Sequence, residues 1–136
     1  MTSPCPLCTP TDEEVLYLSD LYRIIAVNDP NWPGFCRVIL NAHAAEMTDL
    51  AIECRSAIMK AVCVTESVLR ELMHPDKINL ASLGNVVPHV HWHVIPRWKD
   101  DSHFPDPIWA NPKRAWADKP PVNNLEIAAR LKACLG

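Results

Sequence analysis

The stretch PHVHWHVIPR, residues 88–97, places three histidines at every second position. Side chains of a β-strand alternate between its two faces, so His89, His91 and His93 are expected on one face, with the apolar residues between them on the other. An otherwise apolar strand has little structural reason to carry three aligned imidazoles. We therefore favour a chemical role over a polar strand face that merely satisfies hydrogen bonds.

Imidazole offers two chemistries in this arrangement. Neutral imidazole is a common zinc ligand, and a His-x-His pair on a strand can chelate a metal ion. Alternatively, one imidazole attacks phosphorus or carbon while its neighbours orient it or protonate the leaving group. The residues alone leave both hypotheses open.

A second constellation is the Cys-x-x-Cys motif formed by Cys5 and Cys8. A redox role requires this motif between a strand and a helix, whereas here it precedes every predicted strand. Zinc usually takes four Cys or His ligands, so His43 and one of the three aligned histidines are the candidates for the other two. The motif alone leaves a zinc site and two free thiols on a terminal segment as alternatives.

Length and composition limit the class of protein. With 136 residues and 49% hydrophobic content, the chain can fill the core of one domain. The formal net charge is −3, and the 13 basic residues are scattered, which argues against a nucleic-acid groove or a polybasic membrane patch. No secretory leader is recognisable, and no apolar run approaches the roughly 18 residues that cross a bilayer. We expect a cytoplasmic protein that binds neither nucleic acid nor membrane.

The remaining four cysteines each sit singly inside an apolar stretch, and we expect them to be small buried hydrophobic residues. They are Cys36, Cys54, Cys63 and Cys134.

The elements that must position these residues follow from hydrophobic periodicity. Thr48 or Asp49 is expected to cap the long helix, and Pro75 to end it. Strands, then a helix, then strands, without a βαβ rhythm, predict an α+β domain around a mostly antiparallel sheet. The expected elements are a hairpin over 14–27, a loop over 28–34, strands over 35–41, 78–85 and 89–95, and a helix over 48–72.

The region after residue 97 is rich in proline and tryptophan and predicts an irregular segment that wraps the body of the domain. Trp109 and Trp116 are expected to dock on that body. The final stretch NNLEIAARLKACL predicts a short amphipathic helix, which Asn123 or Asn124 would cap.

The segment HVHWHVI resembles the signature of the histidine triad (HIT) superfamily of nucleotide hydrolases and transferases. The similarity continues upstream in VNDPNWPGFCRVILNAHAAEMTDL, which has the family's order of an Asn after a strand, a Pro-Gly turn, a strand and a His before the long helix. The segment DDSHFPDPIWA resembles bacterial members related to Fhit-like dinucleoside polyphosphate hydrolases, including diadenosine tetraphosphate hydrolases. The resemblance implies a HIT-like fold and one HIT domain over 1–136: a zinc-knuckle N-terminus at 1–13, a core at about 14–97, and a wrap and helix at 98–136.

The resemblance also implies roles for individual residues. His91 would attack the α-phosphorus of a nucleotide to form a nucleotidyl-imidazole that water then breaks, with a backbone carbonyl holding its other ring nitrogen. His93 would donate to the bridging oxygen of the leaving group. Groups around Gly84 and Asn85 would neutralise phosphate oxygens, and Asn28 would contact ribose.

In family members with an N-terminal Cys-x-x-Cys, the cysteines share zinc with the histidine before the long helix and the first histidine of the triad. The resemblance therefore implies that Cys5, Cys8, His43 and His89 bind zinc. Such a closed site would brace the N-terminus against the triad strand and leave the chemistry to the other histidines.

The favoured hypothesis is a homodimeric nucleotidyl hydrolase or transferase that acts on a dinucleoside polyphosphate or a nucleotide phosphoramidate without an organic cofactor. Two rival hypotheses are a nucleotide-binding interaction protein with incidental turnover and a metallohydrolase whose metal is held by the triad. Trp32 is either the floor of a purine pocket or a packing residue, and Trp92 is expected in the core or a dimer contact.

Overall fold

A computed structural model of the chain describes residues 5–136 and contains a five-stranded sheet and two α-helices. The strand order is β1-β2-β3-β5-β4, and every neighbouring pair is antiparallel. The predicted α+β class with a mostly antiparallel five-stranded sheet is confirmed. The elements are β1 (Glu14–Leu18), β2 (Tyr22–Ala26), β3 (Cys36–Leu40), the short 3-10 helix η1 (Met47–Asp49), α1 (Ile52–Met73), β4 (Lys77–Ala81), β5 (His91–Arg97) and α2 (Asn124–Leu135).

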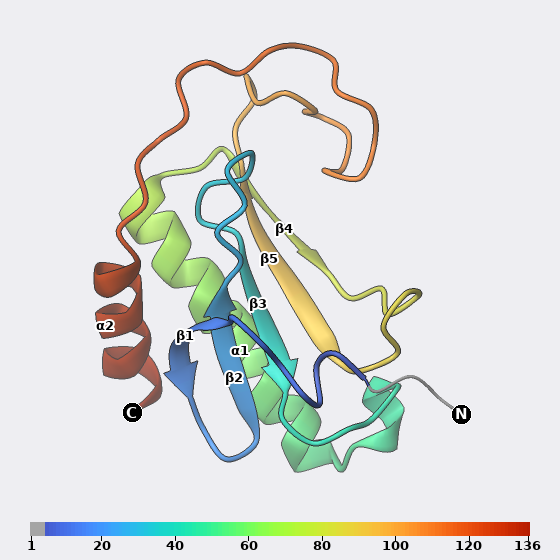
Figure 1. Ribbon diagram of the computed structural model, residues 1–136. Coiled ribbons are helices and arrows are strands. Elements are labelled where there is room, and N and C mark those ends of the chain that lie inside the picture. Colours follow the sequence, from blue (N-terminus) through green and yellow to red (C-terminus); the bar gives the residue numbers. More distant parts are fainter. Residues whose placement is uncertain (1–4) are drawn as a thin grey trace.

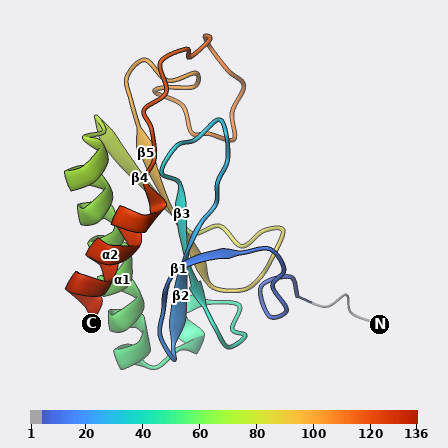
Figure 2. The same ribbon diagram turned by 60° about the vertical axis from the view of Figure 1, so that its left-hand side comes forward.

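Both α-helices cover the same face of the sheet (Figure 1), and Figure 2 shows the N-terminal segment and the β4–β5 loop on the opposite side. The long helix α1 packs on β3, β4 and β5, while α2 packs on α1 and β1. Alternation within the strands sends the apolar side chains toward the helices and leaves the other face for polar groups. The fully buried core side chains include Ile24, Val38, Ile58, Val62, Leu69, Val94, Ile127 and Leu131.

The predicted opening hairpin is confirmed. The polar pair Ser19-Asp20 separates β1 from β2, and the Ser19 hydroxyl accepts a hydrogen bond from the backbone N–H of Tyr22 at 3.1 Å. The backbone N–H of Ser19 donates to the Tyr22 carbonyl at 2.9 Å, which closes the turn. A short polar turn between two apolar runs is therefore sufficient to pair the first two strands.

The two strands around the histidines differ from the prediction. β4 ends at Ala81 rather than at residue 85, and β5 begins at His91 rather than at residue 89. The ladder with β3 begins at the pair His91–Ile39, while the backbone N–H of Val90 donates outside the sheet to the Ala44 carbonyl at 2.8 Å. His89 and Val90 therefore lie outside the regular strand, because Val90 hydrogen-bonds to the segment before η1.

The long helix begins later than predicted and lacks the predicted cap. Leu50 and Ala51 are extended and separate η1 from α1, whose N-cap is Ala51 without a side-chain hydrogen bond. Asp49 instead closes a capping box with Glu46 around η1. The C-terminal prediction is confirmed: α1 ends at Met73, followed by a left-handed residue and Pro75.

Only one of the four single cysteines fits the prediction of burial. Cys36 is fully buried in β3, and burial raises the pKa of its thiol to about 12. Cys54 is half-buried, and Cys63 and Cys134 are exposed. The prediction was wrong for these three because each lies on a helix, where an apolar neighbourhood in sequence includes positions on the solvent side.

The irregular segment after β5 is held by a buried ion pair. Arg97 Nε lies 2.8 Å from Asp101 Oδ2, and both side chains are almost completely buried. The carboxylate also accepts the backbone N–H groups of Trp98, His103 and Phe104, so it orders the start of the segment. Trp116 is buried against Trp98, as predicted, whereas Trp109 is half exposed.

The C-terminal helix starts as predicted, because the Asn123 side chain accepts the backbone N–H of Glu126 at 3.1 Å. Among residues 5–136, neither helix combines the length and apolar character needed to cross a membrane.

Candidate functional site

His91 is the first residue of β5, and its imidazole is oriented by the backbone just before it. Its Nδ1 lies 2.6 Å from the carbonyl oxygen of His89. A carbonyl only accepts, so the neutral ring carries its proton on Nδ1 and leaves Nε2 with a free lone pair. The carbonyl contact implied by the family resemblance is therefore present, and it leaves a nucleophilic nitrogen.

His93 lies two residues further along the same face of β5. Its ring centroid is 5.1 Å from that of His91, with the ring planes at 85°. Phe35 and Trp109 pack edge-on against it at 5.6 and 5.3 Å. Burial, with Arg37 and His91 adding to the effect, lowers the pKa of His93 to about 4. His93 is therefore neutral near neutral pH.

His89 lies in a different environment, although Val90, Trp92 and Val94 all pack on the main core, as the predicted alternation requires. His89 precedes β5, is fully buried, and does not line the cavity around the other two histidines. Its Nε2 donates to the Leu40 carbonyl at 2.6 Å, which leaves Nδ1 without a proton. Burial lowers the pKa of the His89 ring, which keeps it neutral.

The free Nδ1 of His89 instead faces the Cys-x-x-Cys segment and His43. It lies 3.4 Å from Cys5 Sγ, 3.5 Å from Cys8 Sγ and 3.2 Å from His43 Nδ1. The His43 Nδ1 is 3.3 Å from Cys8 Sγ, and all four atoms lie within 4.8 Å of one another. The structure thus brings together all four predicted metal ligands.

These separations fit a zinc ion. Tetrahedral ligands at ~2.0–2.3 Å from zinc stand roughly 3.3–3.8 Å apart, close to the observed spacing. The His89 contact with the Leu40 carbonyl has the form of the outer hydrogen bond that orients metal-binding histidines. Two thiols and two imidazole nitrogens also form a donor set that zinc prefers. The cluster can therefore hold zinc in a closed four-ligand site.

The segment that carries the two cysteines is anchored to the sheet by Arg23. Its guanidinium binds Glu13 through two hydrogen bonds of 2.6 and 3.0 Å and donates to the Leu7 carbonyl at 2.9 Å. This ion pair is largely shielded from solvent. The predicted N-terminal knuckle spans 1–13, of which residues 1–4 lie outside the described part of the chain.

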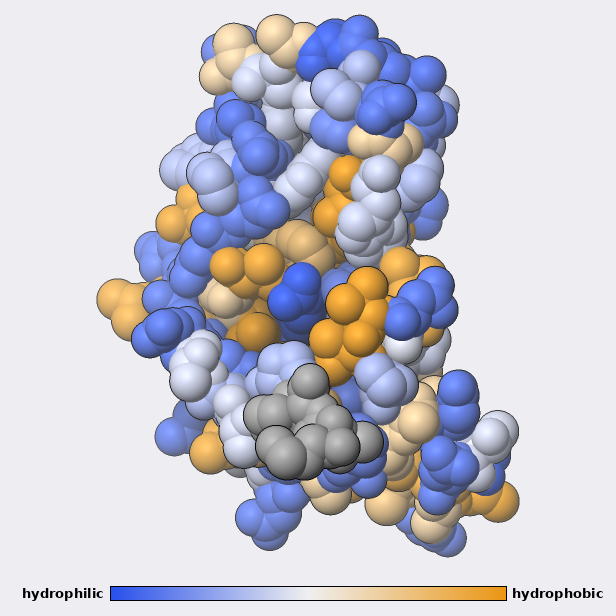
Figure 3. Space-filling model, turned by 45° about the vertical axis from the view of Figure 1, so that its right-hand side comes forward, coloured by the Kyte–Doolittle hydropathy of each residue, from blue (hydrophilic) through white to orange (hydrophobic). Residues whose placement is uncertain are grey.

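A cavity of about 380 Å³ surrounds His91 and His93. Gly84 and Asn85 line it, and Gly84 has φ +69°, a left-handed conformation that glycine adopts without strain. Figure 3 shows a polar hollow between apolar groups on this side of the molecule. The residues that line the cavity are Leu7, Arg37, Leu83, Gly84, Asn85, Val86, Val87, His91, His93 and Trp109.

Sequence reasoning overlooked Arg37, which is the one Lys or Arg among the residues that line this cavity. The Arg37 Nε donates to His93 Nδ1 at 3.3 Å. Burial lowers the pKa of Arg37, but a guanidinium stays protonated at neutral pH. The available signal was a lone basic residue inside the apolar stretch FCRVILN, at a position opposite the triad strand.

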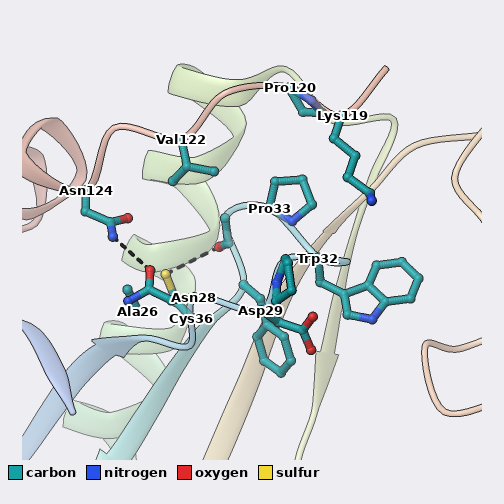
Figure 4. Close-up of a pocket in the computed structure, with 13 residues that line it drawn as sticks. Ala26, Asn28, Asp29, Trp32, Pro33, Cys36, Lys119, Pro120, Val122 and Asn124 are labelled. Carbon is teal, nitrogen blue, oxygen red and sulfur yellow. Dashed lines mark hydrogen bonds between the residues drawn. The ribbon is translucent and has the colours of Figure 1, made fainter. Parts of the chain in front are cut away.

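Asn28 lies in a different cavity, of about 260 Å³, between the loop after β2 and the segment before α2. Its Oδ1 accepts a hydrogen bond from Asn124 Nδ2 at 3.0 Å (Figure 4). The φ of Asn28 is +57°, a left-handed conformation that asparagine tolerates. Phe35 lines this cavity and also packs on His93, so its ring links this cavity to the histidines.

Trp32 is a buried packing residue that also lines the cavity of Asn28. It is buried with Phe35 and Ile95 in a small cluster of its own. His103 packs edge-on against its indole at 4.9 Å, and the Arg97 guanidinium lies 5.3 Å from the ring centroid. Trp92, as predicted, packs against the main core.

Comparisons with known proteins identify the family to which this chain belongs. The HIT domain family matches residues 9–100. The chain belongs to the HIT family. Curated relatives named AP-4-A phosphorylase, from two strains of Mycobacterium tuberculosis, are 30% identical over 102 residues, which is 69% of this chain and 52% of the relative. The chain therefore spans about half the length of the curated relatives it matches.

Solved structures of HIT proteins confirm the fold. A histidine triad protein from Bradyrhizobium japonicum has a TM-score of 0.70 at 24% identity, over 92% of each chain. One from Marinobacter aquaeolei has a TM-score of 0.70 at 28% identity, over 91% of this chain and 89% of that one. A zinc-bound histidine triad family protein from Mycobacterium smegmatis has a TM-score of 0.63 at 21% identity, over 95% and 88% of the two chains.

Proposed function

We propose that this HIT protein is a nucleotidyl hydrolase or transferase that cleaves a dinucleoside polyphosphate or a nucleotide phosphoramidate at the α-phosphorus. The observation that carries the proposal is the 2.6 Å contact between His91 Nδ1 and the His89 carbonyl. That contact leaves Nε2 of His91 unprotonated on the face of β5 that borders the 380 Å³ cavity.

In the first step, His91 Nε2 forms a bond to the α-phosphorus while the bond from phosphorus to the leaving group breaks. In the second step, water or inorganic phosphate attacks the nucleotidyl-histidine and restores the free imidazole. Water would yield the nucleoside monophosphate, and phosphate would yield the nucleoside diphosphate. The name of the Mycobacterium tuberculosis relatives, AP-4-A phosphorylase, motivates the inclusion of phosphate as an acceptor.

His93 is proposed to donate a hydrogen bond from its Nε2–H to the departing bridging atom, while water supplies the proton that an amine leaving group takes up. The His93 ring is neutral near neutral pH because burial lowers its pKa to about 4, and its Nδ1 already accepts from Arg37. The proton of the neutral ring therefore sits on Nε2. A neutral donor of this kind stabilises charge as it develops on the leaving group.

Gly84 and Asn85 are proposed to contact phosphate oxygens, because both line the cavity beside the histidines. Asn28 is proposed to contact the ribose from the neighbouring cavity, which Phe35 links to His93.

A structural zinc ion is proposed for Cys5, Cys8, His43 and His89. Their spacing and the Leu40 contact support zinc, and a zinc-bound HIT protein of the same fold is known from Mycobacterium smegmatis. When bound, zinc would tie the N-terminal segment to the residue whose carbonyl orients His91. We also predict that the protein is a homodimer, which sedimentation would check. Its predicted place in the cytoplasm would be checked by cell fractionation.

The rival metallohydrolase receives no support from the geometry. Among residues 5–136, the metal-binding cluster includes His89 but neither His91 nor His93. The ligands that converge with His89 are Cys5, Cys8 and His43 rather than the other two histidines of the triad. The interaction-protein hypothesis predicts that the protein binds a nucleotide without substantial turnover, whereas the enzyme hypothesis predicts turnover.

The deciding experiment traps the intermediate. The protein is mixed briefly with diadenosine tetraphosphate or with adenosine 5′-phosphoramidate and quenched, and its mass is measured by intact-protein mass spectrometry. The wild type is expected to gain the mass of one adenylyl group, and His91→Gly is expected not to. His74→Asn is the matched control because His74 lies at the end of α1, outside the cavity, in a left-handed conformation that asparagine accepts.

Turnover without an adduct on wild type would contradict the covalent mechanism, and binding without turnover would favour the interaction protein. Adding inorganic phosphate distinguishes the acceptors, because a phosphorylase produces ADP where a hydrolase produces AMP. Metal analysis of the same variants is expected to show zinc lost from Cys8→Ser and retained by His91→Gly.

A further inference from the structure

Three arginines of the sheet are buried or half-buried, but only two of them are neutralised. Arg23 and Arg97 each pair with a carboxylate, at 2.6 and 2.8 Å. Within residues 5–136, Arg37 has no carboxylate within ion-pair distance, and its Nη atoms donate no hydrogen bond. A half-buried cation without a counter-ion is costly, so this position is suited to a charge that arrives with a ligand.

The acidic groups near Arg37 are already engaged. Glu13 and Asp29 act on Arg37 at longer range. The Glu13 carboxylate binds Arg23, and Asp29 accepts the backbone N–H of Asn31 at 2.9 Å. The Arg37 guanidinium is held instead by the Phe35 ring, at 5.4 Å from its centroid, and by His93. Its terminal nitrogens therefore remain available on the border of the cavity.

The register of the sheet fixes the side on which this charge lies. In the β3–β5 ladder, Arg37 is paired with His93, whereas Ile39 is paired with His91. The positive charge thus lies beside the proposed hydrogen-bond donor His93, and one residue pair of the ladder separates it from the pair that contains the proposed nucleophile. Because His93 is proposed to face the bridging atom, the charge lies next to the leaving group.

We propose that Arg37 recognises a phosphorylated leaving group and thereby selects nucleoside polyphosphates over nucleotide phosphoramidates. This inference rests on the proposed function, because it assigns the leaving-group side of the same site. Arg37 would act in two ways: its Nη atoms bind oxygens of the phosphate next to the attacked phosphorus, and its Nε keeps the His93 proton on Nε2.

The two substrate classes differ in what they require of such a cation. When a dinucleoside tetraphosphate is cleaved at the α-phosphorus, the departing nucleoside triphosphate carries several negative charges. When a phosphoramidate is cleaved, the departing nitrogen takes a proton from water and leaves as an uncharged amine. An interaction of Arg37 with the leaving group's phosphates therefore lowers the barrier for the tetraphosphate alone. The second effect, by which Arg37 keeps the His93 proton on Nε2, acts on both substrates.

The test compares Arg37→Met and Arg37→Gln with wild type on diadenosine tetraphosphate and on adenosine 5′-phosphoramidate, which transfer the same adenylyl group. We expect kcat/KM for the tetraphosphate to fall about 100-fold and that for the phosphoramidate by less than about tenfold. Arg37→Lys keeps the charge and should recover part of the tetraphosphate activity. Arg130→Met is the control, since Arg130 pairs with Glu71 on the helices, outside the cavity.

A second measurement does not depend on turnover. Binding of inorganic tripolyphosphate is followed by calorimetry, and nitrogen NMR of the imidazoles reports the His93 tautomer. Wild type and Arg130→Met are expected to bind the anion at least tenfold more tightly than Arg37→Met and Arg37→Gln. If wild type binds it no better than they do, or if both substrates lose activity equally, the inference is wrong. If wild type binds the anion through Arg37 but turns over neither substrate, the proposed function fails and the anion site stands.

Discussion

The strongest quantitative prediction concerns the acid stability that His93 imposes on the fold. Arg37, His91, Phe35 and Trp109 surround its ring, and burial lowers its pKa to about 4, against an ordinary value of 6.5. The folded pKa is the lower one, so the unfolded chain binds the extra proton between these two values. Stability from this group is therefore present above pH 6.5 and is lost as the pH falls toward 4.

The size of the loss follows from the two pKa values. Relative to pH 7, the free energy of unfolding falls by about 2 kcal/mol at pH 5 and by about 3 kcal/mol at pH 4 from His93 alone. Urea unfolding of wild type and His93→Gln at matched metal content measures this, because acid effects of all other groups appear in both proteins. The difference between the two proteins should change with pH by the stated amounts.

The matched control is His74→Asn, which replaces a histidine at the end of α1, outside the cavity, with a residue that accepts its left-handed conformation. If the pH dependence of unfolding for His93→Gln follows that of wild type, the His93 ring titrates normally in the folded protein. In that case its assignment as a neutral donor at neutral pH is refuted.

Three further predictions concern the framework of the site. Replacing Cys8 by Ser should remove bound zinc and lower the melting temperature, whereas the exposed Cys63→Ser should change neither, as measured by elemental analysis and calorimetry. Asp101→Ala leaves the buried Arg97 without its partner and should cost about 3–5 kcal/mol in urea unfolding; a loss under about 1 kcal/mol would mean that water replaces the carboxylate. Asn123→Ala removes the cap of α2 and should cost about 1 kcal/mol, while Asn123→Ser should recover most of it.

Local sequence determined the elements and the kinds of chemistry available. Period-two histidines between apolar residues predict a strand with an imidazole face, and the polar turn at Ser19 predicts the first hairpin. The cap at Asn123 and the stop at Pro75 were predictable as well, because each depends on a residue's own backbone and side chain. The family signature added the ligand set Cys5, Cys8, His43 and His89, which the structure brings together.

Other features depended on contacts that a local pattern does not contain. Strand alternation predicted which residues face the core, but it did not predict that the ladder starts at residue 91 or that the His89 ring contacts the Leu40 carbonyl and the cysteines. The missing cap of α1 has a similar origin, since Leu50 and Ala51 are extended between two helical segments.

The clearest division between sequence and structure is at Arg37. The sequence determined that a basic residue lies inside an apolar strand, but a solvent-facing arginine, a structural ion pair and a ligand-binding cation are all compatible with that pattern. Only the pairing of β3 with β5 placed it against His93, and only the positions of the carboxylates left it without a counter-ion. Charge neutralisation is a long-range property of the folded chain, because it depends on which side chains meet across the sheet. Residue types and periodicity thus determined the imidazole chemistry, and tertiary contacts decided which groups share one site.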